Sequence, residues 1–492
     1  MRFHYHSIAI MMLALCTFAQ ADLRPSSMFG DHMVLQRDMP IPVWGRAEPG
    51  DTVTVTFAGD EVATVTGPDG RWQLELPALE ASAEGRILTI QGANQIIAFE
   101  DVLVGEVWIC AGQSNMQYGW GNESHSMFNW GGDDDLAALV PDARQRPIRS
   151  YHVPVNVSFE PEENSNGKWS PDVSGSAIAF GFSYYLQKEL DVPVAVIVTC
   201  WGSSSIEGWM PRELTEALPH FKDIMMAFDA STNTRERIQA AIDRGVRPGN
   251  VFIRKQPNLL YNAMLHPIIP YASRGIVWYQ GEANTDQPGL YAQSLPVWIK
   301  RLRELWDRED FFVLGVMLPG YGQDNGHPDA NSWAWFREAQ IRGFDLPYAA
   351  VVNTIDLGDA KDIHPLDKEP IARRLSRLAR DKVYRQRSNG KGPVYRRART
   401  KGNRMIVQFF HADGLKTTDG SAPRGFWLQD QQGDWHPAQA VINNSVVVLQ
   451  ADGVQDPQAI RYAWSGKPDV NLVNAAGLPA YPFRTDDTTS GN

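Results

Sequence analysis

The middle of the chain constrains the fold most, because short apolar runs alternate there with amphipathic helical patterns. The runs span residues 104–110, 194–199, 275–279, 312–317 and 349–353. Between them, apolar residues recur at helical spacing, as at Ile178, Phe182 and Leu186. Strands that alternate with helices form a parallel sheet that is covered on both faces. We therefore predict an α/β fold in which helices sandwich a central parallel sheet.

The two flanking regions have β character instead. Apolar residues alternate with threonines around Val55, and short apolar segments near the C-terminus are separated by Gly, Asp and Asn clusters. A chain of 492 residues is too long for one core. We predict a β module at 22–104, an α/β domain at 105–390 and a β module at 391–492. The two β modules could pack together as one sandwich.

The N-terminus has the pattern of a targeting segment. A basic residue precedes the apolar stretch 8–18, and small residues stand at positions −3 and −1 of a cut before Asp22. This is the arrangement of a cleaved secretory signal. We predict a signal peptide at 1–21 and an exported protein that is periplasmic or secreted.

Cysteine content and charge exclude several classes of protein. Without the signal, two cysteines remain, Cys110 and Cys200, which are too few for a disulfide framework or a four-thiolate metal site. We expect buried free thiols, with one bridge between strand ends as the alternative. A net charge of −11 without a basic stripe argues against nucleic-acid binding. The rest of the chain has no apolar run long enough for a membrane span, and the oligomeric state stays open.

The residues that follow the apolar runs are the candidates for chemistry, because ligands bind beyond the carboxyl ends of parallel strands. The polar or glycine residues at these positions are Ser114, Gly202, Gln280, Asn284, Asp362 and His364. A hydroxyl, a glycine-rich turn, carboxamides and an Asp/His pair thus converge on one edge of the predicted sheet. This convergence indicates an enzyme.

These residue types fit nucleophilic catalysis. A serine needs a base to attack a carbonyl, and the base needs an orienting acceptor. His364 can take the proton of Ser114, and Asp362 can orient the imidazole. The backbone N–H groups of Ser114 and Gly202 and the side chain of Asn284 can stabilise the oxyanion. The chain has no Gly-x-Ser-x-Gly elbow, which disfavours the ordinary α/β-hydrolase arrangement.

Four motifs carry a family resemblance: VGEVWICAGQSNM, WGSSSIEGWM, IVWYQGEANT and DIHP. Together with MVLQRDMPIPVWG near the start and NLVNAAGLPAYPFRTD near the end, they resemble the sialate O-acetylesterase family of the SGNH hydrolase superfamily. The resemblance covers nearly all of the chain after the signal. It implies a serine esterase that removes O-acetyl groups from carbohydrates without a metal or organic cofactor. It also implies Ser114 as nucleophile, His364 as base, and Gly202 and Asn284 as oxyanion donors.

Two departures from the wider superfamily leave alternatives open. Its acid usually stands three residues before the histidine, where this chain has Lys361, whereas Asp362 matches the narrower family's Asp-x-His. Its third motif usually reads Gly-x-Asn, and here Gly281 and Asn284 are one residue further apart. Gln280 is therefore an alternative donor. The alternative acids are Asp356, Asp359 and Glu282, although Asp359 could simply cap a turn and Glu282 could pair with an arginine.

Other features near the motifs admit two interpretations each. Tryptophans could stack on sugar rings or pack in the core; those beside the catalytic loops are Trp120, Trp130, Trp201, Trp209, Trp333 and Trp335. The stretch 117–170 resembles a long loop over the site. Its run of three aspartates, 133–135, favours a solvated turn over a calcium site.

The substrate is the least constrained feature. A sialic acid carries a carboxylate, which favours a nearby arginine or lysine. The motifs offer only Lys361 and, further off, Arg212 and Arg337. We therefore expect neutral acetylated oligosaccharides, such as acetyl-xylan fragments, ahead of O-acetylated sialic acid. The rival hypothesis is a non-catalytic carbohydrate-binding protein on the same fold.

Overall fold

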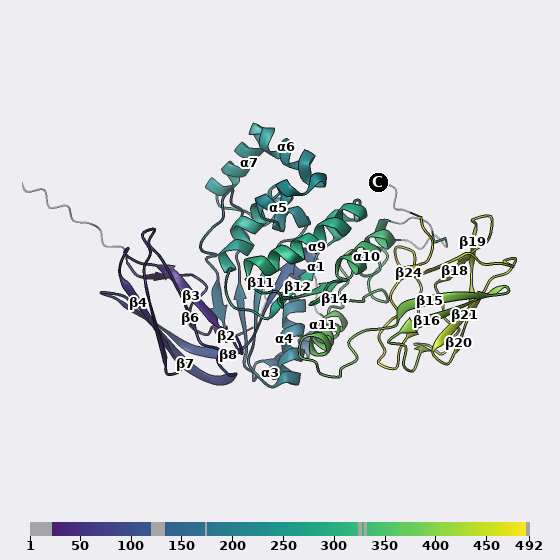
Figure 1. The fold of residues 1–492 in the computed structure, drawn as a ribbon, viewed down its shortest axis with the longest axis horizontal. Coiled ribbons are helices and arrows are strands. Elements are labelled where there is room, and N and C mark those ends of the chain that lie inside the picture. Colours follow the sequence, from purple (N-terminus) through teal and green to yellow (C-terminus); the bar gives the residue numbers. More distant parts are fainter. Residues whose placement is uncertain (1–21, 120–132, 173–174, 323–326, 329–331, 489–492) are drawn as a thin grey trace, which may run out of the picture.

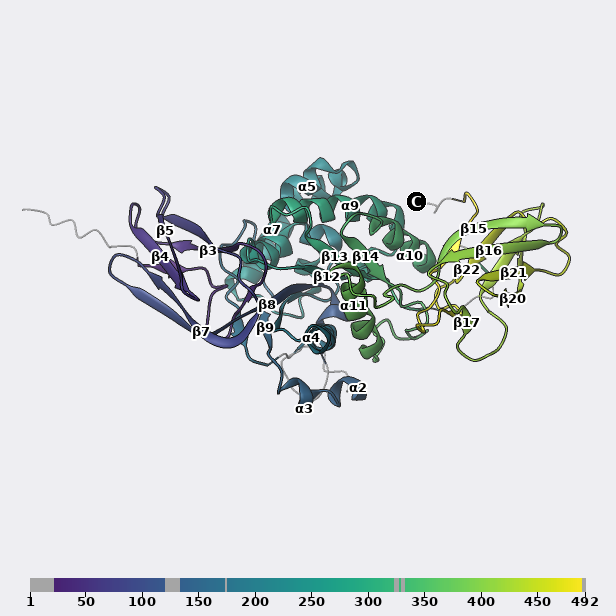
Figure 2. The ribbon, with the colours of Figure 1, turned by 60° about the horizontal axis from the view of Figure 1, so that its bottom comes forward.

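Three regions follow one another along the molecule. The computed structural model describes residues 22–119, 133–172, 175–322, 327–328 and 332–488, so the predicted signal at 1–21 lies outside the described residues. Two β-rich regions lie at opposite ends of a central helix-covered sheet (Figures 1 and 2). The expectation that the flanking modules pack together is therefore wrong, because the central domain lies between them.

The central sheet contains all five predicted runs. Its strand order is β10-β9-β11-β8-β12-β13-β14, and β10 pairs antiparallel while the other pairings along this path are parallel. The strands are β8 (Ile96–Gly112), β9 (Ile148–His152), β10 (Lys168–Ser170), β11 (Val194–Cys200), β12 (Gly275–Tyr279), β13 (Phe312–Val316) and β14 (Ala349–Val352). The expectation of one long loop at 117–170 is wrong, since β9 and β10 lie within that stretch.

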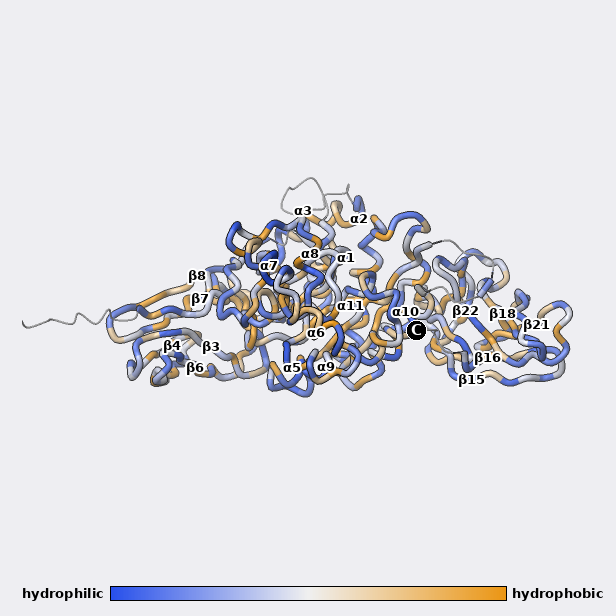
Figure 3. The backbone as a smooth tube through the Cα atoms, turned by 90° about the horizontal axis from the view of Figure 1, so that it is seen from above, coloured by the Kyte–Doolittle hydropathy of each residue, from blue (hydrophilic) through white to orange (hydrophobic). Residues whose placement is uncertain are grey.

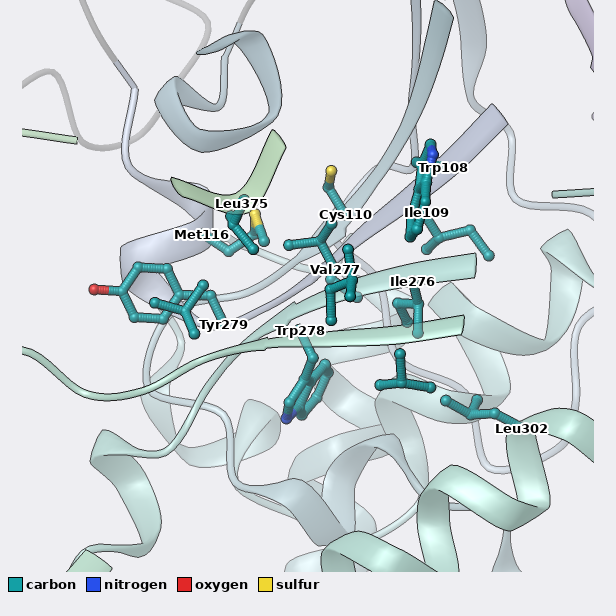
Figure 4. Close-up of a cluster of buried hydrophobic side chains, with 14 of the residues drawn as sticks. Trp108, Ile109, Cys110, Met116, Ile276, Val277, Trp278, Tyr279, Leu302 and Leu375 are labelled. Carbon is teal, nitrogen blue, oxygen red and sulfur yellow. The ribbon is translucent and has the colours of Figure 1, made fainter. Parts of the chain in front are cut away.

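Helices cover both faces of this sheet. On one face lie α4 (Ala177–Leu190) and α11 (Glu369–Lys382), and on the other lie α9 (Pro288–Leu305) and α10 (Ser332–Gly343) (Figure 1). Figure 4 shows the same division in the core: Cys110 and Leu375 lie on one side of the strands, and Trp278 and Leu302 on the other. Burial on both faces explains why these strands are unbroken apolar runs.

Shorter helices occupy the connections. The α-helices are α1 (Ser114–Gln117), α2 (Asp134–Ala137), α3 (Val140–Ala143), α5 (Arg212–Ala217), α6 (Lys222–Ala230), α7 (Thr232–Asp243) and α8 (Val251–Arg254). The 3₁₀ and π turns are η1 (Ile206–Trp209), η2 (Pro219–Phe221), η3 (Tyr261–Leu265), η4 (His266–Ile268) and η5 (Glu282–Asn284). None of the helices in the described ranges is long and apolar enough to cross a bilayer. In Figure 3 apolar stretches are short and interleaved with polar ones.

The N-terminal region is continuous with the central sheet. Its strands are β1 (Arg24–Pro25), β2 (Val34–Gln36), β3 (Ile41–Arg46), β4 (Thr52–Phe57), β5 (Asp60–Val65), β6 (Arg71–Leu76) and β7 (Ser82–Gln91). The 17-residue strand β8 pairs with β7 in its first half and with β11 and β12 in its second, which joins the strands into one eleven-stranded sheet. The sheet is therefore mixed rather than parallel, and the expected boundary at 104–105 falls inside β8.

The C-terminal region consists of three small antiparallel sheets. Their strand orders are β15-β16-β21-β20, β19-β18-β22-β24 and β17-β23. The strands are β15 (Val394–Lys401), β16 (Arg404–Phe410), β17 (Lys416–Thr417), β18 (Phe426–Gln429), β19 (Trp435–Pro437), β20 (Gln439–Asn443), β21 (Val446–Gln450), β22 (Ala459–Tyr462), β23 (Leu472–Val473) and β24 (Phe483–Arg484). The sequence prediction of β structure after residue 391 is confirmed by these elements.

Both remaining cysteines are buried free thiols, as expected. They lie on neighbouring parallel strands, where Val198 aligns with Cys110. Burial raises the pKa of Cys110 far above its usual value and that of Cys200 to about 12. Both are therefore protonated and unreactive at neutral pH.

A buried carboxylate joins the N-terminal region to the central domain. Glu106 on β8 is 0% exposed and accepts hydrogen bonds from Arg37 at 2.7 Å, Arg274 at 2.9 Å and the Tyr384 hydroxyl at 2.9 Å. Burial alone would raise the pKa of Glu106, but Arg274 and Arg37 outweigh that effect and hold it below its usual value. The charge is thus fully compensated by groups from three parts of the chain.

We expect Glu106→Ala to lower the free energy of unfolding by about 3–5 kcal/mol, because it removes a fully buried carboxylate that compensates two half-buried guanidinium groups. Glu75→Ala, on the exposed face of β6, is the control and should change it by no more than about 0.5 kcal/mol. The contribution of Glu106 is present at neutral pH and disappears as the pH falls below 4.5 through its lowered folded-state pKa. Urea unfolding of both variants at neutral and at acidic pH measures these changes. A loss of unfolding free energy in Glu106→Ala that equals the loss in Glu75→Ala, or that is the same at both pH values, would contradict the prediction.

Candidate functional site

A sharp turn places Ser114 at the carboxyl edge of the sheet. β8 ends at Gly112, whose φ is +145°, and α1 begins at Ser114. A Cβ atom on Gly112 would lie 2.1 Å from the Tyr279 carbonyl oxygen, so glycine is required where β8 passes the end of β12. The Gln113 N–H donates to the same carbonyl at 3.0 Å. The Ser114 side chain therefore emerges just beyond the strand ends.

The structure brings Ser114 and His364 into contact across 250 positions of sequence. The Ser114 Oγ atom lies 2.9 Å from His364 Nε2, which is hydrogen-bond distance. His364 stands on the loop between β14 and α11. A serine hydroxyl that contacts an imidazole in this way is the arrangement required for general-base activation.

Asp362 lies on the other side of the imidazole. Its Oδ1 atom is 3.7 Å from His364 Nδ1 and accepts the backbone N–H of His364 at 2.8 Å. The first distance is an ion-pair contact, longer than a hydrogen bond. Catalytic hydrogen bonds are often long without substrate and shorten in the complex. Asp362 thus fixes the backbone of the loop directly and the ring electrostatically.

The imidazole is held in its basic form. Burial lowers the pKa of His364 below its usual value of 6.5, and Lys368 lowers it further, while Asp362 opposes both. A neutral imidazole can accept a proton, whereas an imidazolium cannot. His364 is therefore able to act as a base at neutral pH.

The alternative acids have other partners. Asp356 forms a bidentate ion pair with Arg374, with both distances 2.7 Å. Asp359 caps its own turn, as its structural interpretation predicted, by accepting two backbone N–H groups. Glu282 accepts from the Asn115 amide at 2.5 Å rather than from an arginine, so the expected arginine pairing is wrong.

Two of the predicted oxyanion donors, Gly202 and Asn284, are already hydrogen-bonded. A Cβ on Gly202 would lie 3.1 Å from the Ser114 Cβ, and the Gly202 N–H donates to Gln117 Oε1 at 2.8 Å. A substrate oxygen would have to replace Gln117. The Asn284 Nδ2 atom donates to Glu207 at 3.3 Å and has a second hydrogen for another acceptor.

Gln280 lies behind Asn284. It is fully buried, and its Nε2 atom donates to Asn284 Oδ1 at 2.8 Å. The Ile206 N–H donates to the same oxygen at 3.0 Å. Both bonds fix the Asn284 carboxamide with its amino group toward Glu207.

Sequence reasoning assigned no role to Gln113 and Asn115, the residues on either side of the nucleophile. The Gln113 side-chain oxygen accepts the N–H groups of Gly281 and Ala283, each at 3.3 Å. Asn115 is fully buried and contacts Glu282. Two carboxamides directly after a buried strand could have indicated this role. A turn that close to the core must satisfy its polar groups with hydrogen bonds inside the protein.

The four described tryptophans near the site are buried among other side chains. Those near the site are 0–6% exposed: Trp201, Trp209, Trp333 and Trp335. The indole N–H of Trp209 donates to Ser204 Oγ, and that of Trp333 to the Pro319 carbonyl. Sugar stacking on these four rings is therefore contradicted, while Trp120 and Trp130 lie outside the described residues.

The aspartates at 133–135 are only partly a solvated turn. Asp134 and Asp135 are exposed in the first turn of α2. Asp133 is buried, caps α2 and accepts the backbone N–H groups of Lys368 and Glu369 at 2.8 and 2.9 Å. Within the described ranges, groups of three or more His, Cys, Asp or Glu side chains arranged to hold a metal are not found.

A cavity of about 400 Å³ opens beside His364. Its lining combines apolar and acidic side chains of one loop: Leu357, Pro365, Leu366, Asp356, Asp359, Asp362 and Asp367. His364, whose imidazole contacts Ser114, lines this cavity. Its wall is negatively charged.

Comparison with known proteins gives one consistent result. A family model for carbohydrate esterases, the sialic acid-specific acetylesterases, matches residues 249–382. The sialate O-acetylesterase of rat (Rattus norvegicus) is 26% identical over 95% of both chains, and that of human (Homo sapiens) is 26% identical over 95% of this chain and 93% of its own. The structure of a carbohydrate acetylesterase from Xanthomonas citri shares 30% identity with a TM-score of 0.80 and covers 94% of this chain and 100% of that one.

These similarities extend well beyond the central sheet. The Xanthomonas structure matches this chain through both flanking β regions as well as the α/β domain. The resemblance inferred from the sequence motifs is thereby confirmed. The protein belongs to the family of sialic acid-specific acetylesterases, which are carbohydrate esterases.

Proposed function

We propose that this carbohydrate O-acetylesterase works through an SGNH-type serine mechanism. Ser114 Oγ attacks the acetyl carbonyl while His364 takes its proton, and the imidazolium then protonates the departing sugar oxygen. His364 then deprotonates a water molecule that attacks the acetyl-serine. When this intermediate collapses, the imidazolium returns the proton to Ser114 Oγ and acetate is released. The single observation that carries the proposal is the 2.9 Å contact of Ser114 Oγ with His364 Nε2 at the carboxyl edge of the sheet.

The oxyanion donors are the N–H groups of Ser114 and Gly202 and the Nδ2 atom of Asn284. Supporting this assignment, Gly202 lies against Ser114 and Asn284 is fixed by Gln280. Gly202 exchanges its bond to the Gln117 side chain for the substrate oxygen. Each such donor lowers the barrier only when charge develops on that oxygen.

The substrate is a neutral acetylated oligosaccharide rather than an acetylated sialic acid. Arg337 is fully buried and donates to backbone carbonyls, and Arg212 pairs with Glu216 and Asp229. Neither is available to a sugar carboxylate. Lys361 is exposed on the loop that carries His364, but the cavity beside His364 is lined by four aspartates and not by Lys361. Segments 120–132 and 323–326 contain no arginine or lysine in sequence. An anionic sugar is therefore disfavoured by like charge.

The flanking β regions support the α/β domain: the N-terminal one shares strand β8 with it, and the C-terminal one contacts it through Arg337. The guanidinium of Arg337 on α10 donates to the carbonyls of Ser465 and Gly466, which ties the C-terminal module to the central domain. The rival function, a binding protein without turnover, leaves the Ser114–His364 contact without a role. Export through the segment 1–21 is part of the proposal and rests on its sequence pattern.

We expect Ser114→Ala and His364→Ala each to lower kcat on an aryl acetate by at least ~10³, because each removes one half of the activated nucleophile. The chain offers a matched control, since Ser294 and His220 form a second serine–histidine contact of 2.7 Å. Ser294 lies on α9, away from the strand ends. Ser294→Ala and His220→Ala should retain kcat. Thermal unfolding checks folding, and turnover by a folded Ser114→Ala variant would rule out the mechanism.

We expect Asp362→Asn to lower kcat by up to ~10⁴, as in other serine triads. Asp362 raises the pKa of His364, so its loss should also move the acid limb of the kcat/KM profile to lower pH. In the wild type that limb should lie below pH 6.5. Asp356→Asn is the control and should leave the limb in place. A stronger effect of Asp356→Asn would reassign the acid.

We expect kcat/KM for acetyl-xylooligosaccharides to exceed that for 9-O-acetylated sialic acid by about tenfold, or ~1.4 kcal/mol in transition-state binding. The difference should shrink at high salt, because salt screens the repulsion between the sugar carboxylate and the aspartates. Acetate release from both substrates, measured side by side at two ionic strengths, tests this. A tenfold preference for the sialic acid would reverse the assignment.

A further inference from the structure

Two buried charged residues beside the site have no part in the proposed mechanism. Lys368, at the start of α11, is 0% exposed, and the carboxylate of Glu282 lies in η5, after β12. They meet through one side chain. Lys368 Nζ donates to Asn115 Oδ1 at 2.7 Å, and Asn115 Nδ2 donates to Glu282 Oε1 at 2.5 Å.

The same side chains also hold the loop that carries His364. Asn115 Nδ2 donates to the Ile363 carbonyl at 3.1 Å, and Lys368 Nζ donates to the Pro365 carbonyl at 2.5 Å. The residues immediately before and after His364 are therefore both tied to this chain of contacts. Asn115 itself follows Ser114 in the sequence. The two halves of the Ser114–His364 contact are thus connected by buried hydrogen bonds over a very short path.

We propose that Lys368, Asn115 and Glu282 form a positioning relay that fixes His364 over Ser114 and keeps a buried cation beside the imidazole. Asn115 is the central member because it contacts both charged groups and the histidine loop. The three are positioning residues, since they act on the reaction through Ser114 and His364. The inference rests on the proposed function of those two residues.

The charges around the relay are consistent with this role. Burial lowers the pKa of Lys368 to about 7, while Glu282, Asp362, Asp133 and Asp367 raise it. Below pH 7 the ammonium is therefore charged. Burial raises the pKa of Glu282, while the hydrogen bond from Asn115 and the charge of Lys368 lower it, and the effect of burial is the larger.

Among the described residues, two charged groups shift the pKa of His364. Lys368 lowers the pKa of His364, and Asp362, on its own loop, raises it. Removing the cation should therefore make His364 easier to protonate. The predicted shift has the opposite sign to that of Asp362→Asn.

The main test is Lys368→Met in the full chain, with Lys300→Met, an exposed lysine on α9, as the matched control. We expect kcat on an aryl acetate to fall about 10- to 100-fold, because small displacements of a base have effects of that size. KM should change by no more than about twofold. The acid limb of kcat/KM should move to higher pH, and the imidazole titration of His364 followed by NMR should move with it. Lys300→Met should change none of these.

Glu282→Gln provides a second variant, because it keeps an acceptor for Asn115 and removes only the charge. We expect a lower kcat with KM retained. In the double variant Lys368→Met/Glu282→Gln both buried charges are gone, so kcat should be no lower than in Lys368→Met alone. If Lys368→Met does not fold, Glu282→Gln tests the relay: a lower kcat with an unchanged KM supports it, and a wild-type kcat rejects it.

Several outcomes would overturn the relay. Wild-type kcat in folded Lys368→Met or Glu282→Gln would do so, as would a lower kcat with an unmoved acid limb in Lys368→Met, or a double variant whose losses multiply. Failure of the proposed function is separate: turnover by Ser114→Ala and His364→Ala would reject the mechanism whatever Lys368→Met does. Inactive Ser114→Ala and His364→Ala beside a normal Lys368→Met would reject the relay alone.

Discussion

The common end of three parallel strands is the constraint on which the site depends. Gly112 on β8 aligns with Cys200 on β11 and with Tyr279 on β12, so the three strands finish at one level. The absence of a side chain on Gly112 lets β8 and β12 stay in register to that point. The residues that follow each strand lie at the same edge of the sheet. A serine, a glycine turn and a pair of carboxamides therefore come together there.

Buried charge marks both ends of the second half of β8. Glu106 accepts two guanidinium groups where the strand enters the central sheet, and Asn115 links Lys368 to Glu282 just beyond its exit. Removing one partner of such a group is costly, because the other stays buried without compensation. The second half of β8 is therefore held by hydrogen bonds to buried side chains at both ends, and Ser114 lies directly after it.

The elements of the central domain could be predicted because strands buried on both faces are visible as apolar runs. β12 begins and ends at the predicted residues, Gly275 and Tyr279. The continuity of β8 could not be predicted, since residues 96–101 alternate as a half-buried strand and only pairing shows that the same strand enters the second sheet. A local hydrophobic pattern shows which residues of a strand are buried, but it does not show with which strands it pairs.

The site, too, could be predicted from the sequence only in part. Ser114 and His364 were identifiable from residue type and position after a strand, and the structure brings them together. Lys368 was not, because a lysine in a polar stretch is normally exposed. The tryptophans were ambiguous for a related reason: composition gives their number, whereas only packing shows that Trp201 and Trp209 are buried.

The position of the buried cation reconciles two demands on this site. A neutral imidazole is favoured by a nearby positive charge, but a lysine exposed in the cavity would also attract anionic sugars. Lys368 is fully buried and contacts Asn115, so it lowers the pKa of His364 without being available to a ligand. The aspartates face the cavity instead. Lys368 thus helps to keep the base unprotonated, while carboxylates of the loop that carries His364 line the cavity.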